Sequence, residues 1–171
     1  MESFTKEIIE KAGKIKLLLS DCDGVLTDGG VYYSEKGEEL KRFSMRDGMG
    51  VARLKKLVDV ETGVITGERS EIVQKRVRKL GITEYYPGSK DKYHTFKTII
   101  RKKKLSAFEV AYIGDDSNDL ELMKYVGLSA CPSDAMPVII ENADLKLNNK
   151  GGHEAFREFA EIIIFSKTNS L

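Results

Sequence analysis

Acidic and hydroxyl side chains directly follow three short apolar runs of this 171-residue chain. Asp21 and Asp23 come after the first run, Thr66 after the second and Asp115 after the third. Because ligand sites of open α/β sheets lie outside the carboxyl ends of the strands, we expect these side chains to lie close together. Clustered carboxylates repel one another unless a cation or a proton relieves the charge. The pattern therefore predicts a metal site.

The chemistry of the ligand atoms indicates which metal such a site holds. Carboxylate oxygens suit a small, hard ion that keeps bound waters and contacts a phosphate oxygen, so they favour Mg²⁺ over zinc or copper. We predict Asp21, Asp23 and Asp115 as metal ligands, with Asp116 and Asp119 as acids that support the site or cap a helix. The alternative is that all these acids only cap helices and fill turns, which is a common role of Asp after a strand.

Thr66 and Lys92 are predicted to bind a phosphate group at the same edge. A hydroxyl donor and an ammonium group supply the fixed positive field that phosphoryl transfer needs. Thr66 could instead be the N-cap of the following helix. Lys90 competes with Lys92 for the ammonium role, but Lys92 lies at a predicted helix start, four residues before the apolar Phe96 and on the inward side.

The two cysteines and two histidines point to no further chemistry. A thiolate phosphatase loop needs Arg at the sixth position after its cysteine, and the sixth residue after Cys22 is Asp28, so we predict Cys22 to be a packed side chain. Cys131 shows no spacing typical of a zinc site or a disulfide framework. His94 and His153 show no metal-like spacing, and we predict both to be structural or surface residues.

Apolar runs and helical periodicity alternate along the chain. The predicted strands cover residues 14–20, 60–66, 110–114, 127–131 and 143–147. One predicted helix starts at Gly48, a second stops at Gly81, and three more cover about 91–103, 119–126 and about 153–165. This alternation predicts an α/β, doubly wound (Rossmann-like), mainly parallel sheet. The residues from about 29 to 44 are predicted to form a projecting β-hairpin, and residues 81–89 are predicted to form a short connection.

The last predicted helix follows a pair of glycines. Gly151 and Gly152 allow a close approach of backbone to another segment. The helix face formed by Phe156, Phe159, Ile162 and Ile163 could pack in the core or in a subunit interface, and core is our prediction.

Composition sets limits on the class of protein. With 41% hydrophobic and 32% charged residues and only 3 Pro, the chain is predicted to form a single soluble domain over 1–171. A net charge of +1 gives no reason to expect nucleic acid as a partner, and the basic residues 101–104 suit a helix end. No apolar run approaches the roughly 18 residues of a membrane span, and no secretory signal is evident, so a cytoplasmic location is expected. The polar segment 166–171 is predicted to be mobile.

The motifs D-C-D-G-V-L-T, T-G, Lys92 and G-D-D-S-N-D, in this order, resemble the haloacid dehalogenase superfamily of phosphohydrolases over nearly the whole chain. The resemblance implies that Asp21 is the nucleophile and forms a phospho-aspartate. It also implies that Asp23 first protonates the leaving alkoxide and then activates water. In a strand-like geometry Asp21 and Asp23 project to the same side, which agrees with these roles.

The chain lacks room for the substrate-selecting cap domain of most members of that superfamily. Only a hairpin and a helix separate Thr27 from Thr66, and only a helix and a short connection separate Thr66 from Lys92. The capless octulosonate 8-phosphate phosphatases, which act in lipopolysaccharide precursor biosynthesis, are the family that the chain resembles in the following segments: DCDGVLTDGGVYYSEKGEELKRFSMRDGMG, VITGERS, YYPGSKDK, VAYIGDDSND and NKGGHEAFRE.

This closer resemblance implies a small phosphorylated sugar acid as substrate and a homotetramer. In that family the hairpin and the carboxyl-terminal tail of one subunit help close a neighbour's site. The implied substrate-binding residues, besides Asp23 and Lys92, are Ser44, Met45, Arg46, Asp47, Gly48 and Arg76. Arginine is the favoured partner of a carboxylate because its planar fork can bond both oxygens, but Arg46 and Arg76 could also be ordinary solvated charges.

One departure and three alternatives remain. The chain has Glu68 followed by Arg69, whereas the resemblance predicts an arginine at position 68. Hydrolysis of an acylneuraminate 9-phosphate is the nearest alternative substrate, because the two sugar acids are chemically similar. A receiver-type signalling module would place its phosphorylated Asp on a middle strand, and a catalytically idle oligomerisation domain would not need all four motifs.

Overall fold

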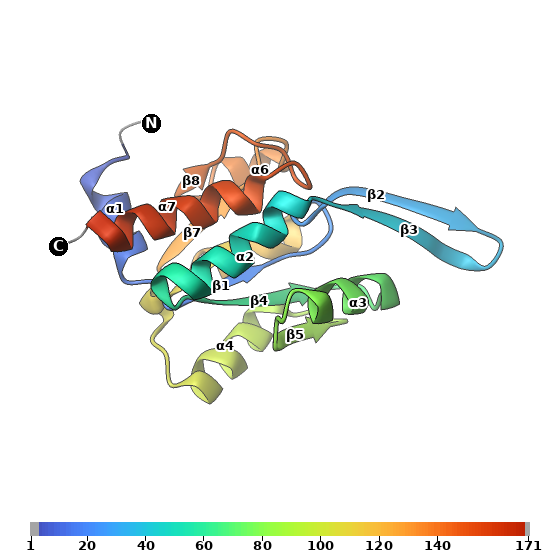
Figure 1. The fold of residues 1–171 in the computed structure, drawn as a ribbon, viewed down its shortest axis with the longest axis horizontal. Coiled ribbons are helices and arrows are strands. Elements are labelled where there is room, and N and C mark those ends of the chain that lie inside the picture. Colours follow the sequence, from blue (N-terminus) through green and yellow to red (C-terminus); the bar gives the residue numbers. More distant parts are fainter. Residues whose placement is uncertain (1–3, 170–171) are drawn as a thin grey trace.

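The computed structural model describes residues 4–169 and contains a six-stranded parallel sheet with helices on both faces (Figure 1). The strand order is β5-β4-β1-β6-β7-β8. The strands of this sheet are β1 (Leu17–Ser20), β4 (Glu61–Thr66), β5 (Glu84–Pro87), β6 (Val110–Ile113), β7 (Leu128–Cys131) and β8 (Leu145–Lys146). The predicted doubly wound α/β class is confirmed, and no cap domain is present within 4–169.

Seven α-helices accompany the sheet in the described part of the chain. They are α1 (Lys6–Gly13), α2 (Met45–Val58), α3 (Glu71–Lys79), α4 (Lys92–Lys103), α5 (Leu120–Met123), α6 (Pro137–Ile140) and α7 (Ala155–Asn169), with short 3₁₀ helices at Ala107–Glu109 and Ser117–Asp119. None of these helices is long and apolar enough to cross a membrane.

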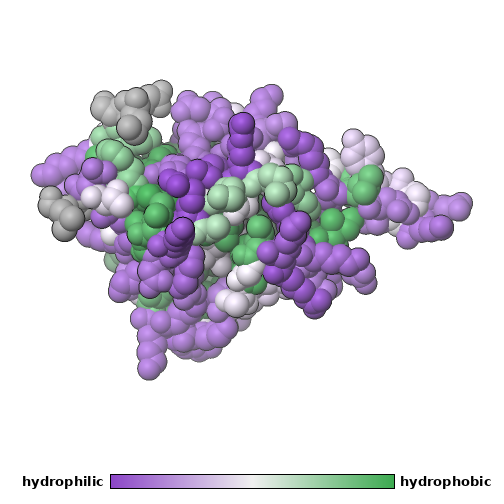
Figure 2. Space-filling view, viewed as in Figure 1, coloured by the Kyte–Doolittle hydropathy of each residue, from purple (hydrophilic) through white to green (hydrophobic). Residues whose placement is uncertain are grey.

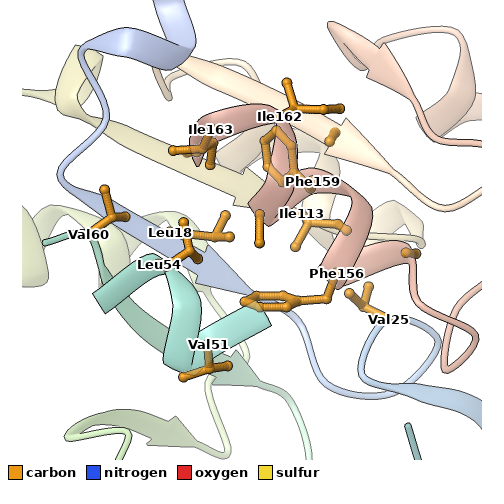
Figure 3. Packing of buried hydrophobic residues seen from close by; sticks show 14 of the residues in the cluster. Leu18, Val25, Val51, Leu54, Val60, Ile113, Phe156, Phe159, Ile162 and Ile163 are labelled. Carbon is orange, nitrogen blue, oxygen red and sulfur yellow. The ribbon is translucent and has the colours of Figure 1, made fainter. Parts of the chain in front are cut away.

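The central strand β1 is buried on both faces, and its side chains alternate between two apolar clusters. Leu18 packs with residues of α1, α2, α3 and α7, whereas Leu17 and Leu19 pack with α4, α5 and α6. Figure 3 shows Phe156 and Phe159 of α7 beside Leu18 in the first cluster. The predicted inner face of the last helix is therefore confirmed as core.

Parallel pairing in register brings the ends of three strands together. Ser20 of β1 pairs with Val64 of β4 on one side and with Ile113 of β6 on the other. The residues that follow β1, β4 and β6 therefore meet at one edge of the sheet, which is the expected ligand-binding edge.

The predicted hairpin is confirmed and projects from the sheet as β2 (Thr27–Ser34) and β3 (Gly37–Phe43) (Figure 1). Three of its large apolar side chains are exposed: Tyr32, Tyr33 and Leu40. In Figure 2 the hydrophobic (green) surface of the hairpin lies on its half near the body of the molecule, and the outer half is coloured hydrophilic to neutral.

Three details differ from the sequence-based expectations. Residues 81–89, predicted as a connection, contain the strand β5. Its Glu84 is a polar residue that the sequence does not mark as part of a buried strand. In the structure Glu84 is buried and accepts hydrogen bonds from Tyr86 and Lys102. The helices α1 and α6 were not predicted. The helix α2 begins at Met45, three residues earlier than predicted, because the Ser44 hydroxyl accepts a hydrogen bond from the Arg46 N–H at 3.1 Å.

Residues 166–169, which we predicted as part of a mobile tail, continue α7. The Ser166 side chain is fully buried and donates a hydrogen bond to the Ile162 carbonyl at 2.9 Å. A polar residue can extend a helix when its hydroxyl bonds back to the preceding turn. The rest of that prediction, 170–171, lies outside the described residues.

Candidate active site

The loop after β1 carries Asp21 into the middle of the sheet edge. The Asp21 N–H donates to the Ile113 carbonyl at 2.9 Å, and its Oδ1 accepts from the Cys22 N–H at 2.7 Å. Gly24 has φ of +85°, and a Cβ at this position would lie 2.0 Å from Asp115 Oδ2. Only glycine lets the two acidic loops approach this closely. Cys22 is buried in the core, as predicted, and burial raises the pKa of its thiol.

A second loop packs against the loop after β1 from the other end of the chain. The Gly152 N–H donates to the Val25 carbonyl at 2.8 Å, and the Gly151 N–H donates to Asp134 Oδ1 at 3.0 Å. A Cβ on Gly151 would lie 1.8 Å from the Gly24 carbonyl oxygen. The predicted close approach at this glycine pair is therefore confirmed, and it braces the loop that holds Asp21.

Lys92 links two of the acids at the first position of α4. Its Nζ lies 3.0 Å from Asp21 Oδ2 and 2.6 Å from Asp119 Oδ1, and its side chain is only 1% exposed. A buried ammonium group is tolerated only when it is paired in this way. Lys90 is exposed, so the structure brings Lys92 to the acids and not its competitor. The carboxylate of Asp91 caps α4 by accepting from the His94 N–H at 2.7 Å.

Asp119 organises the loop after β6. Its Oδ1 accepts from Lys92 and from the Tyr112 hydroxyl at 2.5 Å, and its Oδ2 accepts from the N–H groups of Asp115 at 3.0 Å and Asp116 at 3.2 Å. Four donors therefore hold one buried carboxylate. This arrangement agrees with the supporting role predicted for Asp119, and it leaves Asp115 with its carboxylate free to bind.

Asp21, Asp115 and Asp119 form a group that can hold a cation. One carboxylate oxygen of each lies within 4.8 Å of the others. Burial, together with the neighbouring Asp119, raises the pKa of Asp21 to about 7 against the opposing effect of Lys92. Burial, Asp21 and Asp119 raise the pKa of Asp115 to about 8. Asp115 Oδ1 is buried and has no hydrogen-bond partner among residues 4–169. An unpartnered buried carboxylate oxygen beside other carboxylates suits a hard divalent ion.

The carboxylate of Asp23 lies outside that group. Its Oδ1 lies 2.7 Å from Lys41 Nζ and accepts from the Thr27 hydroxyl at 3.3 Å, while the side chain keeps 27% of its surface exposed. These contacts suit a proton-transfer group at the mouth of the site. The metal-ligand role that we predicted for Asp23 stays a prediction.

Thr66 lies buried at the carboxyl end of β4, where its Oγ1 accepts from the Glu68 N–H at 3.2 Å. The N-cap of α3 is Ser70, whose hydroxyl accepts from the Val73 N–H at 3.3 Å. The alternative role of Thr66 as the helix cap is therefore wrong.

Two residues of the predicted substrate-binding set, Arg76 and Asp47, make contacts that stabilise the fold. Arg76 donates to the Ser44 carbonyl at 2.9 Å and lies over the Phe43 ring at 5.6 Å, so it ties α3 to the start of α2. A Cβ on Gly48 would come within 2.8 Å of the Arg76 guanidinium. Asp47 is buried and accepts from the Arg157 N–H at 2.9 Å, so it secures the start of α7.

Burial raises the pKa of Asp47 to about 6 despite that hydrogen bond. Met45 and Arg46 differ from these inner residues because both are exposed, and Arg46 lies 3.2 Å from Glu154. Within the predicted substrate-binding segment 44–48, therefore, only the side chains of Met45 and Arg46 are accessible to a ligand in this structure.

Sequence reasoning missed Lys41 and Tyr112. A lysine in a projecting hairpin usually indicates solvent exposure, so nothing in the sequence marked Lys41. The Tyr112 hydroxyl offered a signal, since a tyrosine inside an otherwise apolar strand needs a buried hydrogen-bond partner. His94 and His153 are both exposed, as predicted.

Comparisons with known proteins agree with this geometry. Residues 64–152 match the family described as haloacid dehalogenase-like hydrolase. The chain is 40% identical, over 94% of its length and 85% of the relative, to the 3-deoxy-D-manno-octulosonate 8-phosphate phosphatase of Escherichia coli. The crystal structure of the Yersinia pestis phosphatase of the same name superposes with a TM-score of 0.93 at 37% identity, covering 96% of this chain and 89% of that one.

A third relative carries ligands. The phosphatase of this name from Moraxella catarrhalis, in complex with a magnesium ion, a phosphate ion and a KDO molecule, has a TM-score of 0.93 at 32% identity. The match covers 97% of this chain and 95% of that one.

The raised pKa values of Asp21 and Asp115 predict how metal and pH act on stability. A carboxyl whose pKa is raised by folding stabilises the fold fully below its unfolded value of about 4, and this stability is lost as pH rises through about 7 to 8. Mg²⁺ binds the ionised form. We therefore expect Mg²⁺ to raise Tm more at about pH 8.5 than at about pH 5.5. Calorimetric melting with chelator and with Mg²⁺ at both pH values measures this difference.

The matched control for this measurement is Asp115→Asn, which should lose most of the Mg²⁺-dependent rise in Tm at both pH values. An equal rise at both pH values in the unaltered protein would contradict the assignment of these carboxyls to the metal.

Proposed function

Since the chain belongs to the haloacid dehalogenase-like hydrolase family and is a phosphoric monoester hydrolase, we propose that it hydrolyses 3-deoxy-D-manno-octulosonate 8-phosphate to the sugar acid and phosphate. One observation carries this proposal: Asp21 lies at the mouth of β1 with Lys92 on one side and Asp115 near enough to share a cation. A carboxylate in that position can be held ionised and aimed at phosphorus.

The proposed reaction has two steps. Asp21 attacks the phosphorus, the bond from phosphorus to the sugar oxygen breaks, and Asp23 gives its proton to the departing alkoxide. Water then attacks the phosphoryl group on Asp21 while Asp23 takes the proton, which releases phosphate and restores both carboxyl groups. The partly exposed position of Asp23 supports its access to solvent and to the leaving oxygen.

Asp21 and Asp115 are the proposed carboxylate ligands of Mg²⁺, whereas the ligand role of Asp23 stays a prediction because its carboxylate lies outside their group. The unpartnered Asp115 Oδ1 and the raised pKa of Asp21 support a divalent cation at this point. When bound, the ion would supply positive charge to the carboxylates and to the phosphate oxygens.

Lys92 and Thr66 are the proposed phosphate ligands. Lys92 holds its ammonium group between Asp21 and Asp119, where it would neutralise charge on the transferring group, and the Thr66 hydroxyl would donate to a phosphate oxygen. Fixed donors of this kind need no reorganisation during the reaction.

We also propose that the chain acts as a homotetramer of single-domain subunits. With no cap domain, the site edge is open in one subunit, and the hairpin exposes apolar side chains that a neighbouring subunit could bury: Tyr32, Tyr33 and Leu40. Exposed apolar patches of this kind mark protein contacts. The proposed tail contact with a neighbour's site involves residues that the structure describes only up to 169.

The proposed place of action is the cytoplasm, in the supply of sugar acid for lipopolysaccharide. Two free, buried cysteines support a reducing compartment.

A second candidate is hydrolysis of a nine-carbon acylneuraminate 9-phosphate. Glu68 favours it, because an exposed carboxylate stands just after Thr66 where the octulosonate family resemblance predicts Arg. Both acids carry hydroxyls and a carboxylate, but only the acylneuraminate carries an acylamino N–H from which the Glu68 carboxylate could accept a hydrogen bond, so this position could distinguish the two acids.

Asp21→Asn should lower kcat/KM for the sugar phosphate at least about 1,000-fold without loss of fold, because an amide cannot act as the nucleophile. Phosphate release with Mg²⁺, circular dichroism, and mass spectrometry of acid-quenched enzyme are the measurements. The unaltered enzyme should carry one phosphoryl group on Asp21 during turnover. Full-rate hydrolysis with no phosphoryl group on this side chain would refute the mechanism.

A panel of eight- and nine-carbon sugar-acid phosphates tests the substrate. We expect kcat/KM for the octulosonate 8-phosphate to exceed that for the acylneuraminate 9-phosphate at least about tenfold. The opposite order, reversed by Glu68→Arg, would establish the second candidate instead. Equal turnover of aryl phosphates and both sugar acids would rule out both.

Leu40→Glu should dissociate the proposed tetramer, because it puts a charge on apolar surface that would be buried between subunits. Light scattering after gel filtration measures the mass. Phe108→Glu is the matched control, since Phe108 is similarly exposed but lies away from the hairpin. An unchanged mass for Leu40→Glu would show that the hairpin does not hold the assembly together.

A further inference from the structure

Lys41 is a buried lysine in the middle of an exposed hairpin. Its neighbour in β3, Leu40, is 63% exposed, whereas the Lys41 side chain is only 1% exposed and points inward. Lys41 Nζ lies 2.7 Å from Asp23 Oδ1 and 3.3 Å from Glu38 Oε2. Burying an ammonium group costs several kcal/mol unless it is paired, so these two carboxylates hold it in place.

Glu38 fixes the other side of the lysine. Its second oxygen, Oε1, accepts a hydrogen bond from the Ser70 hydroxyl, which also caps α3. A chain of polar contacts therefore runs from Asp23 through Lys41 and Glu38 to Ser70. It joins the loop after β1 to the loop after β4 across the base of the hairpin. Glu38 also balances the charge of Lys41, so Asp23 does not face an uncompensated cation.

The contacts of Asp23 select one orientation of its carboxylate. Lys41 and the Thr27 hydroxyl both approach Oδ1. Thr27 Oγ1 in turn accepts from the Gly29 N–H at 3.2 Å, which fixes the hydroxyl. With Oδ1 held from the protein side, Oδ2 is left for an oxygen atom of the substrate or of water.

We infer that Lys41 is a positioning residue for Asp23, and that it holds the carboxylate so that the other oxygen can exchange a proton with the leaving group. The inference rests on the proton-transfer role proposed for Asp23. A displacement of about 1 Å in a catalytic group can lower a rate about 100-fold. The effect of Lys41 on the reaction rate can therefore exceed its effect on the free energy of unfolding.

The test compares two leaving groups in Lys41→Met, which keeps the length of the side chain but removes its charge. An alkoxide needs a proton to leave, whereas p-nitrophenolate does not. We expect kcat/KM for the sugar phosphate to fall about 10- to 100-fold and that for p-nitrophenyl phosphate to fall less than about 3-fold. The quantity kcat/KM reports the step in which the leaving group departs. An equal fall for both substrates, or no fall, would overturn the inference.

Two further variants separate this inference from the proposed function. Asp23→Asn should show the same dependence on the leaving group, and more strongly. If it does and Lys41→Met does not, only the role of Lys41 is wrong; if Asp23→Asn shows no such dependence, the proposed proton transfer fails and the inference with it. Lys56→Met, at an exposed position of α2 outside the hairpin, is the control and should leave both substrates unaffected.

Glu38→Gln covers the case in which Lys41→Met does not fold. It weakens one anchor of Lys41 but keeps the contact with Asp23. We expect a smaller fall in kcat/KM, again confined to the sugar phosphate, with circular dichroism and Tm showing an intact fold. A fall of equal size for both substrates in this variant would also overturn the inference.

Discussion

The buried ammonium group of Lys92 is the interaction on which the site depends. It lies between Asp21 and Asp119, so it connects the loops that follow β1 and β6 to the start of α4. This pairing lets both carboxylates and the ammonium group be buried at the sheet edge, because isolated charges are strongly disfavoured in a protein interior. The sheet register and the close approach at Gly24 serve to bring these groups within reach of one ammonium.

One ammonium does not balance three carboxylates. Burial, and after it the remaining negative charge, raise the pKa values of Asp21 and Asp115, and one oxygen of Asp115 has no hydrogen-bond partner among the described residues. A divalent cation would correct the balance, and the positive charges of the ion and of Lys92 would then attract an anionic phosphate group. The edge would therefore suit a phosphate group that arrives with a metal ion, because binding of the ion would relieve the repulsion among the carboxylates.

Much of the fold and of the inner site could be predicted because both follow from local patterns. Asp21, Thr66 and Asp115 end buried apolar runs, and parallel strands in register must bring such ends together. Lys41 could not be predicted, since its burial depends on how the hairpin folds back over Asp23. The strand β5 was missed because a buried glutamate satisfied by distant partners looks like a loop residue in the sequence.

The glycine pair at 151–152 has a consequence for how activity arises during folding. This pair touches the loop of the nucleophile, although the two segments come from opposite ends of the described chain. Contacts between such distant segments form slowly, because the entropy of closing the intervening chain must be overcome first. Secondary structure and the second apolar cluster, which contains no residue of α7, can form earlier. Catalytic competence is therefore expected late on the folding pathway, once the first and last segments have met.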